Sequence, residues 1–413
     1  MPAEIMIKNP AAKWHPASRE ERIPAIDIIR GLALFGVLIV NILEVFRLPL
    51  LEHILRHYTG LQGADRAVEV FAMGVLEFKA LTTFSFLFGV GLAIQMERAS
   101  SRNVRARYFL ARRLGWLLVL GAMHMFLIWN GDILTLYAIC GLLLLPLAGL
   151  PWPSLVLIGA ACIALPEFAW FGIQFPSGSD ATSLIARTRE VYGNEGYFAI
   201  LRFRWQETWS FIVPILISVL PRTVGLMYWG AAAWRSGILL SPERHRGKLA
   251  MCLLVGATVG GMLTANDTWA GASGHTLFPW LKNTHLDASI LLALAYVSGL
   301  LLWLTPRLAA RLPGLAAMGR MALTNYLVQS VVLGWVFYGY GFGLFGRVGP
   351  AVAAGIGVAI YVMQVYLSRF WLQRFRFGPF EWLWRSLSYG LRQPMRSGPD
   401  SSHGFNKIRQ VEI

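Results

Sequence analysis

Apolar runs of about 20 residues, separated by short polar and charged segments, dominate the pattern along this chain. A helix needs about 20 mainly apolar residues to cross the hydrocarbon core of a bilayer, because it rises only about 1.5 Å per residue. The pattern predicts an all-α polytopic transmembrane bundle of about ten helices, near residues 28–46, 70–95, 114–130, 132–148, 153–173, 208–235, 249–265, 286–305, 321–342 and 350–372.

The block 208–235 leaves two alternatives open. It contains Pro214, Pro221 and Arg222, and proline either kinks a membrane helix or ends it. One long kinked helix gives ten crossings, and two shorter pieces would give an eleventh.

Lys and Arg are concentrated in alternate loops. The positive-inside rule counts these residues in short loops and gives acidic residues little weight. With ten crossings, a cytoplasmic N-terminus places most of them on the inner side, including the arginine cluster within 98–113. We therefore expect a multi-pass protein of the bacterial inner membrane with both termini in the cytoplasm.

The chain divides into three parts by composition. Residues 1–22 are polar and are expected to form a cytoplasmic segment, and residues 23–390 form the membrane domain. Residues 391–413 contain too little apolar surface to pack and are expected to be disordered. Within the membrane domain, the segment 174–207 mixes aromatic and charged residues, which is typical of a helix lying at the membrane surface.

Composition narrows the class of protein further. Hydrophobic residues make up 56% and charged residues 14% of the chain, whereas roughly a quarter of a soluble protein is charged. The chain has a net charge of +15, and its Lys and Arg residues lie between apolar blocks rather than on one exposed face. This arrangement argues against nucleic acid as a partner and leaves membrane lipid as the expected surroundings. Cys140, Cys162 and Cys252 lie in apolar runs without ligand spacing, so we expect no metal.

Charged and amide side chains inside the apolar runs are the candidate functional residues, because they are costly in a bilayer. In the first run, Asp27 and Arg30 are three residues apart and can pair. Asn41 follows Arg30 by eleven residues, which returns to nearly the same helix face about 16 Å deeper. Both would line one groove; alternatively, Arg30 reaches the headgroups and Asn41 bonds a neighbouring helix.

The third apolar run repeats this arrangement. Arg112 and Arg113 lie at its cytoplasmic end, and His124 follows Arg113 by eleven residues. Arginine suits phosphate because its fork donates two parallel hydrogen bonds, and imidazole exchanges a proton near neutral pH. Asp132, in the following turn, would cap the next helix, orient His124 or meet an acceptor arriving from outside. A purely structural role for His124 is the alternative.

Two further polar groups need partners. Glu77 and Lys79 in the second run are too close in sequence to face each other on one helix. Asn325 and Gln329 are one turn apart and share a face. Such amides either bond neighbouring helices or bind a polar ligand.

Several of these segments together resemble the YeiB-like bacterial membrane proteins, a domain family of unknown function. The resemblance runs from about residue 23 to residue 390. The segments that carry it are RIPAIDIIRGLALFGVLIVNI, FSFLFGVGLAIQMER, RRLGWLLVLGAMH, NGDILTLYAICGLLLLPL, GRMALTNYLVQS and FGPFEWLWRSLSYG. That family is in turn similar to the transmembrane acyltransferase superfamily, which includes heparan-α-glucosaminide N-acetyltransferases and bacterial surface-polysaccharide O-acyltransferases.

The resemblance implies a bundle of roughly ten helices that passes an acyl group from cytoplasmic acyl-CoA to an acceptor on the periplasmic side. In the O-acyltransferases, a histidine follows the basic residue of the first helix by eleven positions, but Asn41 stands there in this chain. This departure leaves His124 as the expected general base or acyl carrier, oriented by Asp132.

The other candidates take supporting roles in this hypothesis. Asn41 and Asn325 would stabilise the oxyanion. Substrate would be bound by Arg30, Arg112, Arg113, Asn325, Gln329, Lys79 and Glu77.

Two other classes of function compete with the acyltransferase hypothesis. Glu77, Lys79 and His124 are also compatible with a proton-linked transporter of small molecules. A noncatalytic membrane partner would use the polar faces only to join helices.

Overall fold

The computed structural model describes residues 22–56, 60–100, 106–165, 176–273 and 285–396. These residues form helices and one isolated β-bridge, between Phe375 and Arg396, which confirms the all-α fold class. Six helical segments are long and apolar enough to cross a membrane, and four shorter apolar helices accompany them. These ten segments overlap the ten predicted runs, although residues 166–173 of the run 153–173 lie outside the described residues. The number of crossings and their orientation stay predictions.

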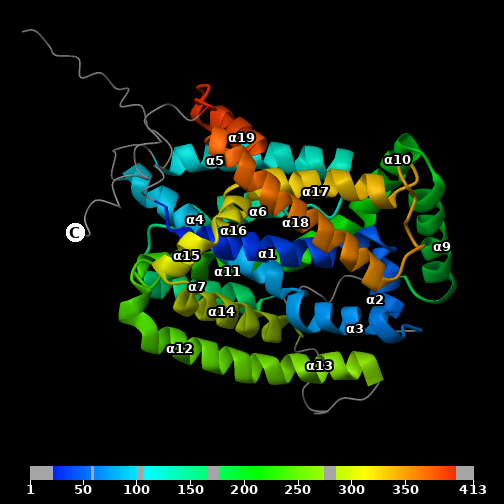
Figure 1. Cartoon of the computed structure of the whole chain (residues 1–413), viewed down its shortest axis with the longest axis horizontal. Coiled ribbons are helices and arrows are strands. Elements are labelled where there is room, and N and C mark those ends of the chain that lie inside the picture. Colours follow the sequence, from blue (N-terminus) through cyan, green and yellow to red (C-terminus); the bar gives the residue numbers. More distant parts are fainter. Residues whose placement is uncertain (1–21, 57–59, 101–105, 166–175, 274–284, 397–413) are drawn as a thin grey trace, which may run out of the picture.

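The helices are labelled in Figure 1. Several spanning segments include turns of π-helix, labelled η. The elements are α1 (Pro24–Asn41), η1 (Ile42–Phe46), α2 (Leu50–Arg56), α3 (Gly63–Phe71), η2 (Ala72–Leu76), α4 (Lys79–Ser100), α5 (Ala106–Met123), η3 (His124–Ile128), α6 (Leu134–Leu144), α7 (Trp152–Ala164), α9 (Gly178–Asn194), α10 (Tyr197–Glu207), η5 (Thr208–Ile212), α11 (Val213–Arg235), the 3₁₀ turn η6 (Pro242–His245), α12 (Arg246–Val255), η7 (Gly256–Gly260), α13 (Gly261–Ser273), α14 (His285–Trp303), α15 (Pro306–Arg311), α16 (Pro313–Arg320), α17 (Ala322–Phe337), α18 (Pro350–Arg374) and α19 (Pro379–Tyr389).

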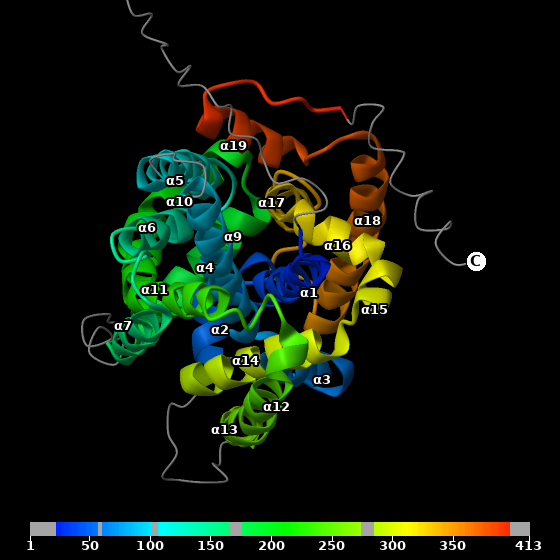
Figure 2. The same cartoon turned by 90° about the vertical axis from the view of Figure 1, so that its left-hand side faces the viewer.

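Helix α1 is the central element of the bundle. Viewed end-on, it is surrounded by α4, α14, α16, α17 and α18 (Figure 2). Its apolar window is 72% buried, more than in any other long apolar segment of the described chain. The phenol of Tyr361 on α18 donates a hydrogen bond of 2.8 Å to the backbone oxygen of Gly31, and this bond ties α1 to its neighbour. Asp27 on α1 is accordingly buried, whereas Arg30 and Asn41 are partly exposed.

Glycine allows very close contact between α4 and α11. A Cβ atom on Gly89 would lie 2.0 Å from the backbone oxygen of Met227, and one on Gly230 would lie 2.0 Å from that of Phe86. Small residues let membrane helices approach closely enough for backbone to touch backbone. The two helices are therefore held by packing that a single added methyl group would disturb.

The block 208–235 forms one helix rather than two. Pro221 lies inside α11 without ending it, and α11 continues backwards through η5 into α10. Neighbouring helices can satisfy the backbone groups that proline frees in a membrane helix. The extra crossing that two pieces would have given is therefore absent from this described segment.

The run 70–95, in contrast, is interrupted. Helix η2 ends at Leu76, and α4 begins at Lys79. Phe78 between them has φ +56°, in the left-handed region that non-glycine residues rarely adopt. The sequence has no proline or glycine at residues 77–79, so the interruption carries no local sequence signal.

Two peripheral parts complete the fold. Helix α9 runs across the ends of the spanning helices (Figure 1), consistent with a surface position for part of the segment 174–207. Residues 391–396 fold back, and the amide of Arg376 donates to the oxygen of Met395 at 2.9 Å. The rest of the segment expected to be disordered, 397–413, and nearly all of 1–22 lie outside the described residues.

Candidate functional site

His124 and Asp132 form a buried pair at the junction of η3 and α6. The Nδ1 atom of His124 lies 2.8 Å from Oδ1 of Asp132, and both side chains are inaccessible to solvent, at 1% and 0% exposure. The other carboxylate oxygen accepts a hydrogen bond of 2.6 Å from the amide of Thr135 in the first turn of α6. Asp132 thus performs two of the three tasks that the sequence left as alternatives, capping the helix and orienting the imidazole.

The pairing determines which nitrogen of His124 can accept a proton. A carboxylate accepts hydrogen bonds, so Nδ1 carries the hydrogen and Nε2 is the basic atom of the neutral ring. Within the described residues, Nε2 is buried and has no hydrogen-bond partner. The imidazole therefore presents an unoccupied proton acceptor inside the bundle.

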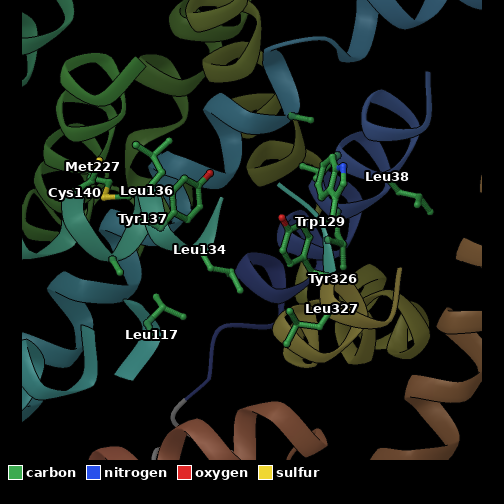
Figure 3. Packing of buried hydrophobic residues seen from close by; sticks show 14 of the residues in the cluster. Leu38, Leu117, Trp129, Leu134, Leu136, Tyr137, Cys140, Met227, Tyr326 and Leu327 are labelled. Atoms are coloured by element: carbon green, nitrogen blue, oxygen red, sulfur yellow. The ribbon is translucent and has the colours of Figure 1, made fainter. Parts of the chain in front are cut away.

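Aromatic rings enclose His124. The centre of the Tyr326 ring, on α17, lies 5.1 Å from the centre of the imidazole ring, and the centre of the Trp129 ring lies 6.3 Å from it. Figure 3 shows Trp129 and Tyr326 close together among buried apolar side chains. The hydroxyl of Tyr326 accepts a hydrogen bond of 3.3 Å from the amide of Ile133. These contacts hold a polar group within an otherwise apolar surrounding.

A cavity of about 240 Å³ reaches Tyr326 and Ile133 beside this pair, although neither His124 nor Asp132 lines it. Leu114 and Leu117 line its apolar part, and Tyr326, which contacts the imidazole, lines it as well. Its guanidinium groups belong to Arg22, Arg30, Arg113, Arg320 and Arg385. These five arginines outnumber the acidic groups beside them, which are Glu381 in the lining and Asp27 paired with Arg22 and Arg30, so the cavity is suited to an anion.

Helix α19 closes the arginine-lined end of this cavity. The indole nitrogen of Trp384 donates to the backbone oxygen of Arg113 at 2.8 Å, and the guanidinium of Arg113 lies 3.6 Å from the centre of the Trp384 ring. Thr324 donates two hydrogen bonds, from its amide and its hydroxyl, to the carboxyl group of Glu381. Figure 2 shows α19 lying across α5 and α17.

Arg385 on α19 keeps its charge despite its burial. Burial lowers the pKa of Arg385 to about 10, with a further contribution from nearby Arg22. A group with that pKa still carries its proton at pH 7. Arg385 therefore contributes a positive charge to the cavity at neutral pH.

The structure brings only some of the predicted site residues together. Arg30 lines the cavity and pairs with Asp27 at 2.9 Å, and Arg113 lines it from α5. Arg112 is not among the lining residues; its guanidinium donates to the oxygen of Leu387 at 3.1 Å. Asn41, at the end of α1, is partly exposed and does not line the cavity.

The two predicted amides on α17 bond the neighbouring helix. Asn325 donates to the hydroxyl of Ser368 at 2.9 Å, and Gln329 donates to the amide oxygen of Gln364 at 2.8 Å. Both are buried and outside the cavity lining. Their geometry matches the helix-joining alternative, because their amide groups are engaged by α18.

Glu77 and Lys79 lie elsewhere, at the interruption between η2 and α4. Lys79 is buried, donates to the oxygen of Met73 at 2.7 Å and lines a separate apolar groove beside Tyr296. Neither residue lines the arginine-lined cavity. The structure therefore separates them from His124, Arg30 and Arg113.

Sequence reasoning missed several residues of the cavity. Arg22 precedes α1, Arg320 ends α16 and Arg385 lies within α19. The sequence alone suggests positive-inside or anchoring roles for them. Tyr326 follows Asn325 directly in the sequence, and its only signal was that proximity. These residues became recognisable once tertiary contacts brought α1, α5, α17 and α19 together.

The sequence is similar to a family of uncharacterized bacterial proteins. Residues 233–391 match the family model described as "Protein of unknown function (DUF418)". The chain is 31% identical over 400 residues to the uncharacterized protein YxaH of Bacillus subtilis, covering 92% of this chain and 97% of the relative. It is 27% identical over 405 residues to the uncharacterized protein YeiB of Escherichia coli, covering 89% and 96%.

Proposed function

This chain belongs to the YeiB-like DUF418 family of membrane proteins, and on that premise we propose that it is an acyltransferase embedded in the bacterial inner membrane. In this proposal it takes an acyl group from cytoplasmic acyl-CoA and transfers it to an acceptor on the periplasmic side.

The observation that carries the proposal is the buried His124–Asp132 pair next to the arginine-lined cavity. A histidine held by a carboxylate at Nδ1 is a general base at Nε2. His124 would remove the proton from an acceptor hydroxyl or amine as that group attacks the thioester carbonyl carbon. The bond from that carbon to sulfur then breaks, and the CoA thiol leaves with a proton.

In this proposal the cavity is the path of the donor. Arg30, Arg113 and Arg385 would bind the phosphates of CoA at the mouth, because guanidinium groups pair with phosphate oxygens through two hydrogen bonds. The narrow apolar part would hold the extended arm that ends in the thioester, placing that group near Tyr326. The tyrosine hydroxyl, which donates to the backbone oxygen of Gly131 at 3.5 Å in this structure, would then donate to the oxyanion instead. Such a bond is most effective where water is excluded.

Asn41, predicted from the sequence as an oxyanion donor, lies outside the cavity lining and has no role in this scheme. Gln329 and Asn325 support the site indirectly, since their amides fix α17 against α18. That fixed helix positions Tyr326 beside His124.

Acyl-CoA binding tests the proposal directly. We expect purified protein in detergent to bind labelled acetyl-CoA, and Arg113→Gln and Arg385→Gln each to weaken binding by about tenfold, since one charged hydrogen bond is worth about 1.5–3 kcal/mol. Arg107→Gln is the matched control, because Arg107 also lies on α5 but donates to the oxygen of Pro146 outside the cavity.

Two results would count against the acyltransferase. One is the absence of acetyl-CoA binding by the wild-type protein, and the other is equal affinity in all three arginine variants. Solute flux into proteoliposomes without CoA would instead favour the transporter, for which the interrupted helix at Phe78 is the supporting observation.

A further inference from the structure

A second cluster of polar side chains lies near η1, α2 and η2, away from the arginine-lined cavity. One carboxylate oxygen each of Glu44 and Glu77 and one ring nitrogen of His53 all lie within 4.8 Å of one another. His53 is buried, and the two glutamates are half-buried. None of these three residues lines the arginine-lined cavity.

The carboxylates of Glu44 and Glu77 have no hydrogen-bond or ion-pair partner among the described residues that would offset the cost of their burial. Across the described residues, neither the Glu44 nor the Glu77 side chain forms a hydrogen bond or an ion pair within 4 Å. Lys79 acts electrostatically on both carboxylates, but its amine donates to the oxygen of Met73 and balances at most one of the two charges. Two neighbouring unpaired carboxylates at this depth are costly without a further cation.

A fourth side chain is placed to orient the histidine. Oε1 of Glu69, a residue only 2% exposed, lies 3.5 Å from Nδ1 of His53, and Arg47 faces the same carboxylate at 3.9 Å. Histidines that bind a metal usually donate their other ring N–H to a carboxylate, which fixes the ring. With Nδ1 toward Glu69, Nε2 of His53 would be the nitrogen that binds the metal.

We propose that Glu44, His53 and Glu77 bind a divalent transition-metal ion, with Zn²⁺ as the best match. One imidazole nitrogen and two carboxylate oxygens form a mixed set that suits such an ion better than Mg²⁺ or Ca²⁺, which prefer oxygen ligands alone. The ion joins three segments that are separate in the sequence and fixes the interruption at Phe78, next to Glu77. The expectation of no metal rested on cysteine spacing, which does not detect a set of this kind.

Metal content of the purified full chain tests the site. We expect about one Zn²⁺ per chain after dialysis against micromolar free Zn²⁺, and loss of that ion in Glu44→Gln, His53→Gln and Glu77→Gln. Excess Mg²⁺ or Ca²⁺ should not displace it. Glu52→Gln is the matched control, since Glu52 precedes His53 on α2 but pairs with Arg189; it should retain the metal.

The orienting carboxylate gives a graded version of the same test. Glu69→Gln should weaken Zn²⁺ binding by about 10- to 100-fold without abolishing it, as expected for a group that acts through the histidine. Full retention of affinity in this variant would contradict the assigned ring orientation.

A spectroscopic measurement keeps the proposal testable if a variant fails to fold. Mn²⁺ bound to the wild-type protein should show coupling to an imidazole nitrogen in pulsed electron paramagnetic resonance, and added Zn²⁺ should remove the signal. Absence of metal from the wild-type protein, absence of nitrogen coupling, or equal Zn²⁺ content in wild type and Glu44→Gln would each overturn the site and leave the carboxylates as a proton-sharing pair.

Discussion

His124→Gln is expected to reduce acyl transfer by about 10³- to 10⁴-fold while leaving acetyl-CoA binding nearly unchanged. Glutamine fills a similar space but cannot take a proton at the position of Nε2. Asp132→Asn should have an effect of similar size, because an amide can donate to Nδ1 and so favours the wrong tautomer of the ring. The measurement is release of CoA and formation of acylated protein or product from labelled acetyl-CoA, with binding measured in parallel.

A surface histidine supplies the control for this pair. His245, in the 3₁₀ turn η6, has its Nδ1 atom 3.1 Å from the oxygen of Ser241 and does not line the cavity. His245→Gln should therefore preserve turnover. Normal CoA release by the His124→Gln protein would remove His124 from the chemistry, whatever the binding result.

Gly89→Ala should destabilise the protein by about 1–3 kcal/mol or prevent its folding. The new methyl group would lie 2.0 Å from the backbone oxygen of Met227, so α4 and α11 must move apart. Backbone atoms yield less readily than the end of a flexible side chain, and the same pair of helices has a second contact of this kind at Gly230. The midpoint of thermal unfolding in detergent, together with the yield of monodisperse protein, measures the effect.

The neighbouring glycine on the same helix gives a matched comparison. A Cβ atom at Gly91 meets nothing within 4 Å, and alanine is favoured over glycine inside a helix by about 1 kcal/mol. Gly91→Ala should therefore leave the midpoint unchanged or raise it. Equal midpoints for the two variants would show that the contact between α4 and α11 is not tight.

Much of the fold was predictable from hydrophobic pattern, because each spanning helix must bury its backbone polar groups within one continuous apolar run. The predicted and observed segments agree best where caps and apolar limits coincide, as at Pro350–Arg374. The interruption at Phe78 could not be predicted, since it depends on how neighbouring helices pack around an unusual backbone conformation. The choice of one helix at Pro221 likewise depended on neighbours.

The candidate site was predictable in part. Spacing marked Arg30 and Arg113 as polar groups at one end of two helices, and both line the cavity, but spacing on a single helix did not predict that the two would meet there. The same argument did not extend to Asn41, which lies outside the cavity lining. A shared face on one helix does not specify which neighbour that face meets.

The sequence did not predict contacts between segments that are distant along the chain. The amides of Asn325 and Gln329 were recognisable as a pair, but their use as bonds to α18 depends on Ser368 and Gln364, which lie 43 and 35 residues away in the sequence. Arg385 and Trp384 join the cavity only because α19 folds against α5. Periodicity carries no information about such distances.

The position of helix α19 in the chain determines when the arginine-lined cavity can be completed during synthesis. It follows all the spanning helices in the chain, yet it supplies Arg385 and the ring that holds Arg113. During synthesis, the arginine-lined cavity therefore stays incomplete until the last apolar helix has left the ribosome and entered the bilayer. A partly inserted chain would lack a finished anion pocket, so donor binding would report complete assembly of the membrane domain.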